Sequence, residues 1–305
     1  MPNLVEENLY LGDLNDAMGL KSSNEANIKF VFSIGIFPTL DKSSSLTYRH
    51  IEVADLPSED LLSHFDSAYE FIRESQSEGA ILVHCYHGVS RSATIVIAYL
   101  MKRDDLGVQT AFDRVKSARD VISPNEGFMH QLALYQRMRM TLDLNFTPYK
   151  LYKLKRLSQI VKDVRLVPSS YGELIKADPG LTSNRPNPNV YKCKKCRRVL
   201  FTLNNIFAHN RGVKFTWKCQ EDGVPPSDSE LCKEKIFIEP LVWMKDVKTC
   251  PSGKLTCPRC NFKLGSYSWI DYCICNCRTK IFPFFYITPS KIDFDIVVKN
   301  VQVTV

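Results

Sequence analysis

The amino-acid sequence predicts an α/β domain followed by a smaller, mostly β domain stabilised by metal ions. Strand-like runs alternate with helical runs over residues 1–145, which is the pattern of an α/β domain. Of the eleven cysteines, only Cys85 precedes Cys193, and several of the others form C-x2-C or C-x-C pairs. A chain of 305 residues is long enough for both domains.

The strands of the first domain are predicted from short runs rich in β-branched and aromatic residues. These runs are residues 8–13, 29–35, 46–53 and 80–85. The spacing of apolar residues predicts helices at 60–76, 108–119 and 126–140, and a mostly apolar run predicts a buried helix at 92–103. This alternation implies a central sheet flanked by helices.

Residues 146–190 change character and are interpreted as a basic segment and linker. The part from 149 to 165 is basic with helical potential, and the part from 176 to 189 is dense in Pro, Asn, Ser and Gly. From residue 191 to 290, short β-prone runs stand between cysteine pairs. A core this small usually needs metal ions or crosslinks for stability.

Charge and hydropathy narrow the class of protein. The formal net charge of +7 permits a partner rich in phosphate but does not specify one. No apolar run approaches the roughly 20 residues of a membrane helix, and the N-terminus lacks the basic-then-apolar opening of a secretory signal. We therefore expect a monomer in cytoplasm and nucleus, without membrane association and with reduced cysteines that bind metal.

The chemistry is concentrated in the stretch HCYHGVSRS, which lies between a predicted strand and a predicted helix. A loop that closes onto a helix N-terminus points backbone N–H groups at one centre, where the helix dipole adds positive charge. Gly88 permits a tight turn, and Arg91 offers a planar fork to two phosphate oxygens. The predicted phosphate-binding residues are Tyr86, His87, Gly88, Val89, Ser90 and Arg91.

Within this loop, Cys85 is the predicted nucleophile, as a thiolate stabilised by the amides and Arg91. Attack on phosphorus gives a phosphocysteine, which water then hydrolyses; no cofactor is needed for catalysis. Ser92 is suited to donate a hydrogen bond to the sulfur as it leaves. Asp55 follows a strand and is the candidate general acid, whereas Glu59 and Asp60 sit where helix caps belong.

This stretch resembles the protein tyrosine phosphatase superfamily, and residues 1–145 resemble its dual-specificity branch. The resemblance extends to VADLPSEDLLSHFDSAYEFI and SPNEGFMHQLALYQ. It implies a phosphoprotein substrate carrying phosphotyrosine or phosphoserine/phosphothreonine. It also implies that Asn125 braces the phosphate loop and that His84 tunes the cysteine, although simple packing of His84 beneath the loop explains it equally well.

The cysteine-rich segment predicts two structural zinc sites with four ligands each. Cys193 and Cys196 are placed with His209 in the first site, whose fourth ligand is Cys219 or Cys232. For the second site the favoured ligands are Cys257, Cys260, Cys275 and Cys277, with Cys273 as the competitor.

The second half, with KCRR, FIEPLVWM and CPRCNFKLGSYSW in order, is similar to the family of dual-specificity phosphatase 12 and its yeast counterpart. The resemblance favours Cys232 over Cys219 as zinc ligand. It implies a nuclear and cytoplasmic protein that assists maturation of the large ribosomal subunit. The alternative function is therefore that of an assembly factor whose catalysis is dispensable. The exposed residues that would contact a pre-ribosomal particle or RNA are Lys214, Phe215, Trp217 and Lys218. The same four residues are equally explained as an ordinary β-strand with a core face and a solvated face.

Overall fold

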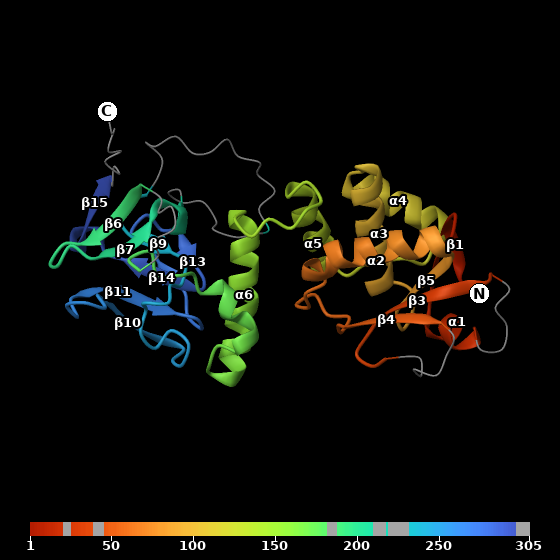
Figure 1. The fold of residues 1–305 in the computed structure, drawn as a ribbon, viewed down its shortest axis with the longest axis horizontal. Coiled ribbons are helices and arrows are strands. Elements are labelled where there is room, and N and C mark those ends of the chain that lie inside the picture. The colour runs from red at the N-terminus through yellow and green to blue at the C-terminus, as the bar shows by residue number, and fades with distance from the viewer. Residues whose placement is uncertain (21–25, 39–45, 182–187, 210–217, 219–231, 297–305) are drawn as a thin grey trace, which may run out of the picture. The chain divides into compact units, whose positions relative to one another are not determined.

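The computed structural model describes residues 1–20, 26–38, 46–181, 188–209, 218 and 232–296. The chain divides into two compact units, Met1–Leu144 and Asn145–Val305 (Figure 1). Among the described residues, no helix combines the length and the apolar character needed to cross a bilayer.

The first unit is built on a five-stranded sheet in the order β1-β2-β5-β3-β4. Its strands are β1 (Asn3–Glu6), β2 (Leu9–Gly12), β3 (Ile28–Gly35), β4 (Thr47–Glu52) and β5 (Ala80–His84). β1 pairs antiparallel with β2, and the other pairs are parallel. The carboxyl ends of β2, β3, β4 and β5 therefore meet at one edge of the sheet, where α/β proteins place their ligand sites.

Helices cover both faces of this sheet. They are α1 (Leu14–Gly19), α2 (Phe65–Glu78), α3 (Arg91–Asp104), α4 (Val108–Ala118) and α5 (Glu126–Arg137), with a 3-10 turn η1 (Leu62–His64) before α2. The helix α1 lies on one face, where Ala17 packs against Ile28 and Leu82, and α2 to α5 lie on the other (Figure 1). This confirms the predicted central sheet flanked by helices.

Two elements of the first unit escaped the sequence prediction, β1 and α1. Both are too short to display a hydrophobic period. The helix α1 is six residues long and begins with a capping box, in which the side chains of Asp13 and Asp16 accept hydrogen bonds from each other's backbone N–H. Its first residues follow β2 directly, so α1 starts beside the end of β5.

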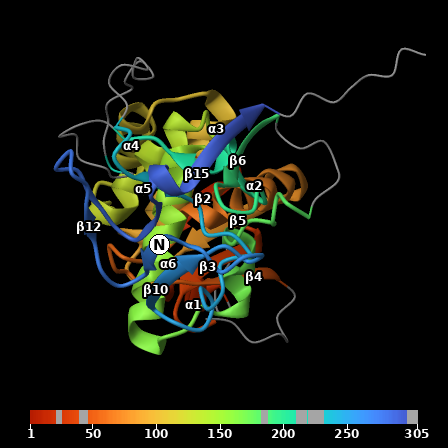
Figure 2. The ribbon, with the colours of Figure 1, turned by 90° about the vertical axis from the view of Figure 1, so that its left-hand side faces the viewer.

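The second unit consists of a long helix and three antiparallel sheets. The helix is α6 (Thr147–Val164). One sheet has the order β15-β6-β7, formed by β15 (Ile292–Ile296), β6 (Asn189–Cys193) and β7 (Val199–Thr202) (Figure 2). Another has the order β10-β11-β14-β9-β8, formed by β10 (Ser252–Thr256), β11 (Lys263–Ser268), β14 (Phe284–Ile287), β9 (Ile236–Ile238) and β8 (Ile206–Phe207). The third pairs β12 (Cys273–Ile274) with β13 (Lys280–Ile281), and 3-10 turns η2 (Ser169–Leu174), η3 (Leu203–Asn205) and η4 (Pro289–Lys291) complete the unit.

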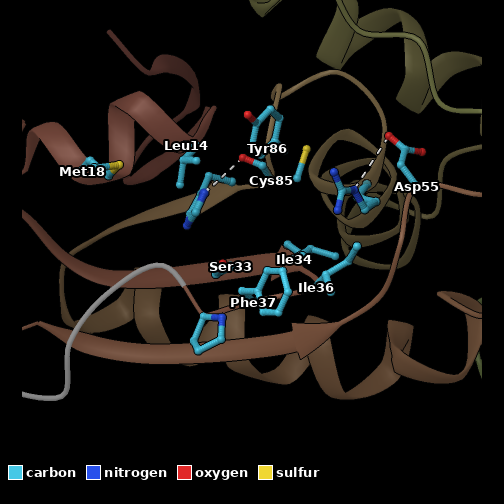
Figure 3. Close-up of a pocket in the computed structure, with 13 residues that line it drawn as sticks. Leu14, Met18, Ser33, Ile34, Ile36, Phe37, Asp55, Cys85 and Tyr86 are labelled. Carbon is cyan, nitrogen blue, oxygen red and sulfur yellow. Dashed lines mark hydrogen bonds and ion pairs between the residues drawn. The ribbon is translucent and has the colours of Figure 1, made fainter.

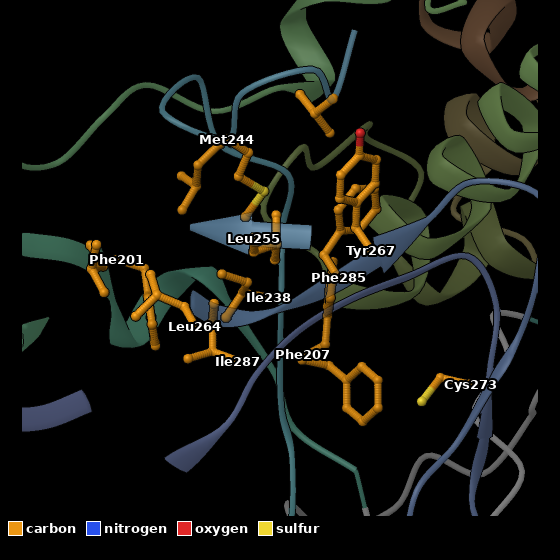
Figure 4. Packing of buried hydrophobic residues seen from close by; sticks show 14 of the residues in the cluster. Phe201, Phe207, Ile238, Met244, Leu255, Leu264, Tyr267, Cys273, Phe285 and Ile287 are labelled. Atoms are coloured by element: carbon orange, nitrogen blue, oxygen red, sulfur yellow. The ribbon is translucent and has the colours of Figure 1, made fainter. Parts of the chain in front are cut away.

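The core of the second unit is aromatic. Tyr267 and Phe285 stack with their ring centroids 5.8 Å apart (Figure 4), and Trp269 meets Phe285 edge to face. The indole N–H of the buried Trp269 donates to the carbonyl of Val247 at 2.8 Å. The core is therefore closed by aromatic packing in which the indole N–H of Trp269 has a hydrogen-bond acceptor.

The helix α6 belongs to this core, and it covers the part of the basic segment for which the sequence indicated helical potential. Leu154, Leu157 and Val161 of α6 are buried in the same cluster as the aromatic residues of the sheets. Lys150 near its start forms an ion pair with the buried Glu239 at 3.2 Å. The lysines and arginines of this basic segment therefore share an amphipathic helix with a buried apolar face.

Candidate active site and metal centres

The loop from Cys85 to Ser90 joins the central strand β5 to the buried helix α3. Residues 81–84 of β5 are buried, and α3 is buried from Arg91 to Met101. Gly88 has φ +67°, and a Cβ atom there would lie 2.6 Å from the carbonyl oxygen of Gly12. Only glycine fits this turn, so the loop closes tightly onto the first turn of α3.

The carbonyl groups of the loop are held outward by donors from other segments. The carbonyl of Tyr86 accepts from the N–H of Leu14 at 3.2 Å, and that of Val89 accepts from the N–H of Ser123 at 2.9 Å. The carbonyl of Gly88 accepts from Nε of Arg119 at 3.0 Å. Since N–H and C=O point in opposite directions across a trans peptide, the amides of the loop are directed toward its centre. This arrangement is a preformed anion cradle.

Arg119 is a site residue that sequence reasoning missed. Besides Gly88, its guanidinium reaches the carbonyl of His87 at 3.4 Å and the side chain of Asn3 at 2.6 Å. It follows α4 and precedes the turn of Ser123, which holds the same loop. Nothing in the local sequence marks it, because its partners lie about 30 and 116 residues away.

The sulfur of Cys85 lies at the mouth of α3 and is buried. The hydroxyl of Ser92, in the first turn of α3, donates to this sulfur at 3.2 Å. The Nε–H of Arg91 is buried and has no hydrogen-bond partner among the described residues, while its Nη1 donates to the carbonyl of Val53 at 3.2 Å. The cradle thus presents an N–H donor with no acceptor next to the buried thiol, which an oxyanion can satisfy.

His84 is buried beneath the loop. Its Nδ1 donates to the carbonyl of Cys85 at 3.2 Å, and its Nε2 has no hydrogen-bond partner among the described residues. Burial lowers the pKa of His84 to about 4, although the Cys85 carbonyl, Asp13 and Asp16 raise it. The imidazole is therefore neutral near pH 7 and holds the loop by one hydrogen bond.

Asp55 faces the cradle from the segment that follows β4. Its Oδ1 accepts from the hydroxyl of Ser90 at 2.7 Å and from Nδ2 of Asn125 at 2.9 Å. The backbone N–H of Asn125 donates in turn to the hydroxyl of Ser90 at 3.2 Å, and Oδ2 of Asp55 lies 3.8 Å from Nε of Arg91. Asn125 therefore contacts both the loop and the carboxylate, while its own Oδ1 caps α5.

The segment that carries Asp55 rests on α5. Gln131 accepts hydrogen bonds from the N–H groups of Leu61 and Leu62 at 2.9 and 2.8 Å. A Cβ atom on Gly127 would lie 2.0 Å from the carbonyl oxygen of Pro57, so the two backbones are in direct contact. Asp60 accepts from the N–H and hydroxyl of Ser63 and caps the turn before α2, whereas Asp55 accepts from Ser90 of the loop.

Asp55, His84, Cys85 and Arg91 are among the residues that line a cavity of about 520 Å³. Figure 3 shows Cys85 and Tyr86 on one side, Asp55 at one end, Leu14 and Met18 at the other, and Ile36 and Phe37 opposite. The cavity collects the segments that follow β2, β3, β4 and β5, as the parallel order of the sheet requires.

The second unit brings the eight predicted ligands together in two groups of four. One group holds Cys193, Cys196, Cys257 and Cys260; the other holds His209, Cys232, Cys275 and Cys277. The ligand atoms of each group lie within 4.8 Å of one another. Cys250 and Cys273 stand outside both groups, and Lys235 donates to the sulfur of Cys273 at 3.3 Å. Residues 214, 215, 217 and 219 lie outside the described residues.

The predicted division of these ligands between the sites was wrong. The turn of Cys193 faces the turn of Cys257, rather than His209 and Cys232. The two turns are alike, since the N–H of Arg197 donates to the carbonyl of Cys193 and that of Asn261 to the carbonyl of Cys257. After β7 the chain leaves the β15-β6-β7 sheet. It then forms β8, which pairs with β9 in the five-stranded sheet, and His209 follows β8 and lies with Cys275 and Cys277 of the β12–β13 turn.

The ligand types and their closeness fit a bound cation in each group. Burial raises the pKa of the Cys257 and Cys275 thiols to about 12, so these sulfurs ionise at neutral pH only beside a positive charge. The imidazole of His209 is buried, and its Nε2 has no hydrogen-bond partner among the described residues. Burial also lowers the pKa of His209, which keeps it in the neutral form that ligates metals.

Comparisons with known proteins agree with the site. Residues 9–138 match the family model described as "Dual specificity phosphatase, catalytic domain". Dual specificity protein phosphatase MPK-4 of Drosophila melanogaster is 32% identical, over 99% of this chain and 89% of that protein.

Two further relatives match nearly as much of the chain. Dual specificity protein phosphatase 12 of Mus musculus is 34% identical, over 95% of this chain and 87% of that protein. Tyrosine-protein phosphatase yvh1 of Schizosaccharomyces pombe is 29% identical, over 95% of this chain and 83% of that protein. With the phosphate cradle, these matches show that the chain belongs to the dual specificity protein phosphatases, which are cysteine-dependent protein phosphatases.

Proposed function

We propose that the first unit hydrolyses phosphotyrosine and phosphoserine/phosphothreonine in proteins through a phosphocysteine intermediate on Cys85. The observation that carries this proposal is the hydrogen bond of 3.2 Å from Ser92, in the first turn of α3, to the sulfur of Cys85 at the start of a loop whose carbonyls accept hydrogen bonds from other segments. We assign catalysis to Met1–Leu144 and metal binding to the unit that begins at Asn145.

In the first step the Cys85 thiolate attacks phosphorus, the S–P bond forms and the P–O bond to the substrate breaks. The loop amides and Arg91 hold the equatorial oxygens, which carry the charge in the transition state. Asp55 gives a proton to the leaving oxygen, from the position where Ser90 and Asn125 hold its carboxyl group.

In the second step water attacks phosphorus, Asp55 takes the proton of the water, and the S–P bond breaks. The Ser92 hydroxyl stabilises the departing sulfur anion through the hydrogen bond already formed in the free protein. Phosphate leaves, and the thiolate and the protonated Asp55 are ready for another cycle.

The test separates the two steps. Ser92→Ala slows only the departure of sulfur, so rapid quenching is expected to show a burst of leaving group equal to the enzyme concentration, with acid-stable phosphate on the protein. Cys85→Ser is expected to show neither burst nor turnover. Two outcomes would contradict the mechanism. One is that no phosphoprotein intermediate is found in the wild type, and the other is that the steady-state turnover of Ser92→Ala equals that of the wild type.

For the metal we propose two structural Zn²⁺ ions. Zinc–sulfur bonds of about 2.3 Å in a tetrahedron place the sulfurs about 3.8 Å apart. The distances are 3.8 Å from Cys193 to Cys260, 3.5 Å from Cys196 to Cys257 and 3.6 Å from Cys232 to Cys275. Four protein ligands leave no open position, so the ions would stabilise the fold. X-ray fluorescence of the purified chain is expected to show zinc at two per chain.

A second candidate function is that of an assembly factor for the large ribosomal subunit, acting in nucleus and cytoplasm through the second unit. The favouring observation is a group of exposed cations beside the Cys193 and Cys257 turns: Lys194, Lys195, Arg259 and Lys263. Such a surface suits a phosphate-rich partner such as RNA. Co-sedimentation with pre-ribosomal particles is expected to survive Cys85→Ser and to be lost when Lys194 and Lys195 are changed to Glu. The opposite pattern would refute it.

A further inference from the structure

The rim of the catalytic cavity carries large apolar side chains that the phosphate chemistry does not use. Phe37 is 79% exposed, Tyr86 60%, Met18 56% and Ile36 51%. All four line the cavity that holds Cys85 (Figure 3). Exposed apolar side chains gathered at one place indicate a contact surface, whereas scattered ones do not. We call these four residues the apolar rim.

The apolar rim is assembled from three segments whose positions are fixed by the fold. Met18 stands on α1, which is anchored to the sheet by the buried Ala17. The N–H of Leu14, at the start of α1, donates to the carbonyl of Tyr86 and so joins α1 to the phosphate loop. Ile36 and Phe37 follow directly after the central strand β3. Any substrate bound at Cys85 must therefore lie beside this rim.

The charged residues of the cavity argue against a second acidic group of the substrate as the partner of the apolar rim. Its charged lining residues are Asp55 and Arg91, and both belong to the phosphate chemistry. His84 is neutral because it is buried, and no lysine lines the cavity among the residues that the structure describes. Those lining residues therefore offer no further cation to a second phosphate or to an acidic side chain next to the phosphorylated residue. An apolar side chain would instead cover apolar surface that is now in contact with water.

We infer that the apolar rim selects phosphorylated residues with a large apolar side chain as a direct neighbour in the protein substrate. The inference rests on the proposed function, because the rim acts on a substrate already held at Cys85. The flanking side chain packs on Phe37 and Met18, and the phosphoryl group occupies the cradle. Phe37 and Met18 are thus specificity-determining residues.

The test compares three phosphotyrosine peptides that differ only at the two flanking positions, which carry Leu, Ala or Glu. The expected kcat/KM follows the order Leu, Ala, Glu, with about tenfold between Leu and Ala. Phe37→Ala and Met18→Ala are each expected to bring the ratio of Leu to Ala peptide close to one. Leu4→Ala is the matched control, since Leu4 on β1 is 53% exposed and does not line the cavity; it is expected to keep the wild-type ratio.

Failure of the rim and failure of the chemistry give different results. Without turnover of a small aryl phosphate the proposed chemistry fails, and the binding of the same peptides to Cys85→Ser still tests the rim. If the three peptides have equal kcat/KM while the aryl phosphate is still hydrolysed, the proposed selectivity of the apolar rim is refuted and the proposed chemistry is not. Preference for the Glu peptide, or faster hydrolysis of a phosphoinositide in vesicles than of the Leu peptide, overturns it as well.

Discussion

Protonation of His84 should make the first unit lose stability as the pH falls. In the folded chain burial lowers the pKa of His84 from 6.5 to about 4. As the pH falls below 6.5, His84 therefore takes up a proton in the unfolded chain before it does so in the folded chain. The stability that His84 provides as a neutral group is complete above that value and is lost progressively between pH 6.5 and pH 4.

The size of the effect follows from these two pKa values. At pH 5 the imidazole is almost fully protonated in the unfolded chain and about one tenth protonated in the folded chain. The difference in proton binding lowers the free energy of unfolding by about 2 kcal/mol relative to pH 7.5. That is a large fraction of the stability of a domain this size.

Hydrogen exchange at the amides of β5 is the suitable assay, because it reports unfolding of the first unit separately from the second. The wild type is compared with His84→Asn, whose side-chain N–H can replace Nδ1 as donor to the Cys85 carbonyl but which does not titrate. The wild type is expected to lose about 2 kcal/mol more than His84→Asn between pH 7.5 and pH 5. His87→Asn, which removes an exposed imidazole of the same loop, is the control and should behave as the wild type. Equal losses in the wild type and in His84→Asn would refute the reasoning.

Three further outcomes follow from backbone contacts and from the metal groups. Gly88→Ala should reduce kcat by roughly a hundredfold, the cost of a displaced oxyanion donor, while the circular dichroism spectrum stays native; unchanged kcat would show that the loop tolerates a Cβ atom 2.6 Å from the Gly12 carbonyl. Gly127→Ala should push the Asp55 segment away through Pro57 and slow hydrolysis of alkyl phosphates more than of an activated aryl phosphate, and an equal effect on both would argue against Asp55 as the acid. Removal of metal by a strong chelator should shift the fluorescence of Trp243 and Trp269 to longer wavelength as the second-unit core opens, and aryl phosphatase activity should persist; an unchanged spectrum would mean that the two groups do not hold the fold.

The catalytic elements were predictable because they are local. The strand, the loop and the helix that hold Cys85, Arg91 and Ser92 are contiguous in the chain, and their backbone geometry brings the side chains to one centre. Asp55 could be chosen because it follows a strand that ends at the same edge of the sheet. Arg119 could not be found, since only the tertiary structure places its guanidinium against the carbonyls of the loop.

The α6 segment shows a different limit of the sequence. Its composition indicated a basic segment with helical potential, and only the tertiary structure shows that Leu154, Leu157 and Val161 are buried in the core of the second unit. A helix with a narrow apolar face is identified only when the surface that covers this face is known.

The sequence by itself determined the α/β order, the phosphate loop with its nucleophile and the cysteine pairs that supply metal ligands, because each of these depends on residues close together in the chain. The tertiary structure decided which ligands share a site. Each close pair of cysteines supplies two sulfurs, and the sheets decide what completes the group: a second pair of cysteines for Cys193 and Cys196, and His209 with Cys232 for Cys275 and Cys277. The same long-range packing created the apolar rim, where three segments distant in sequence meet at one edge of a parallel sheet.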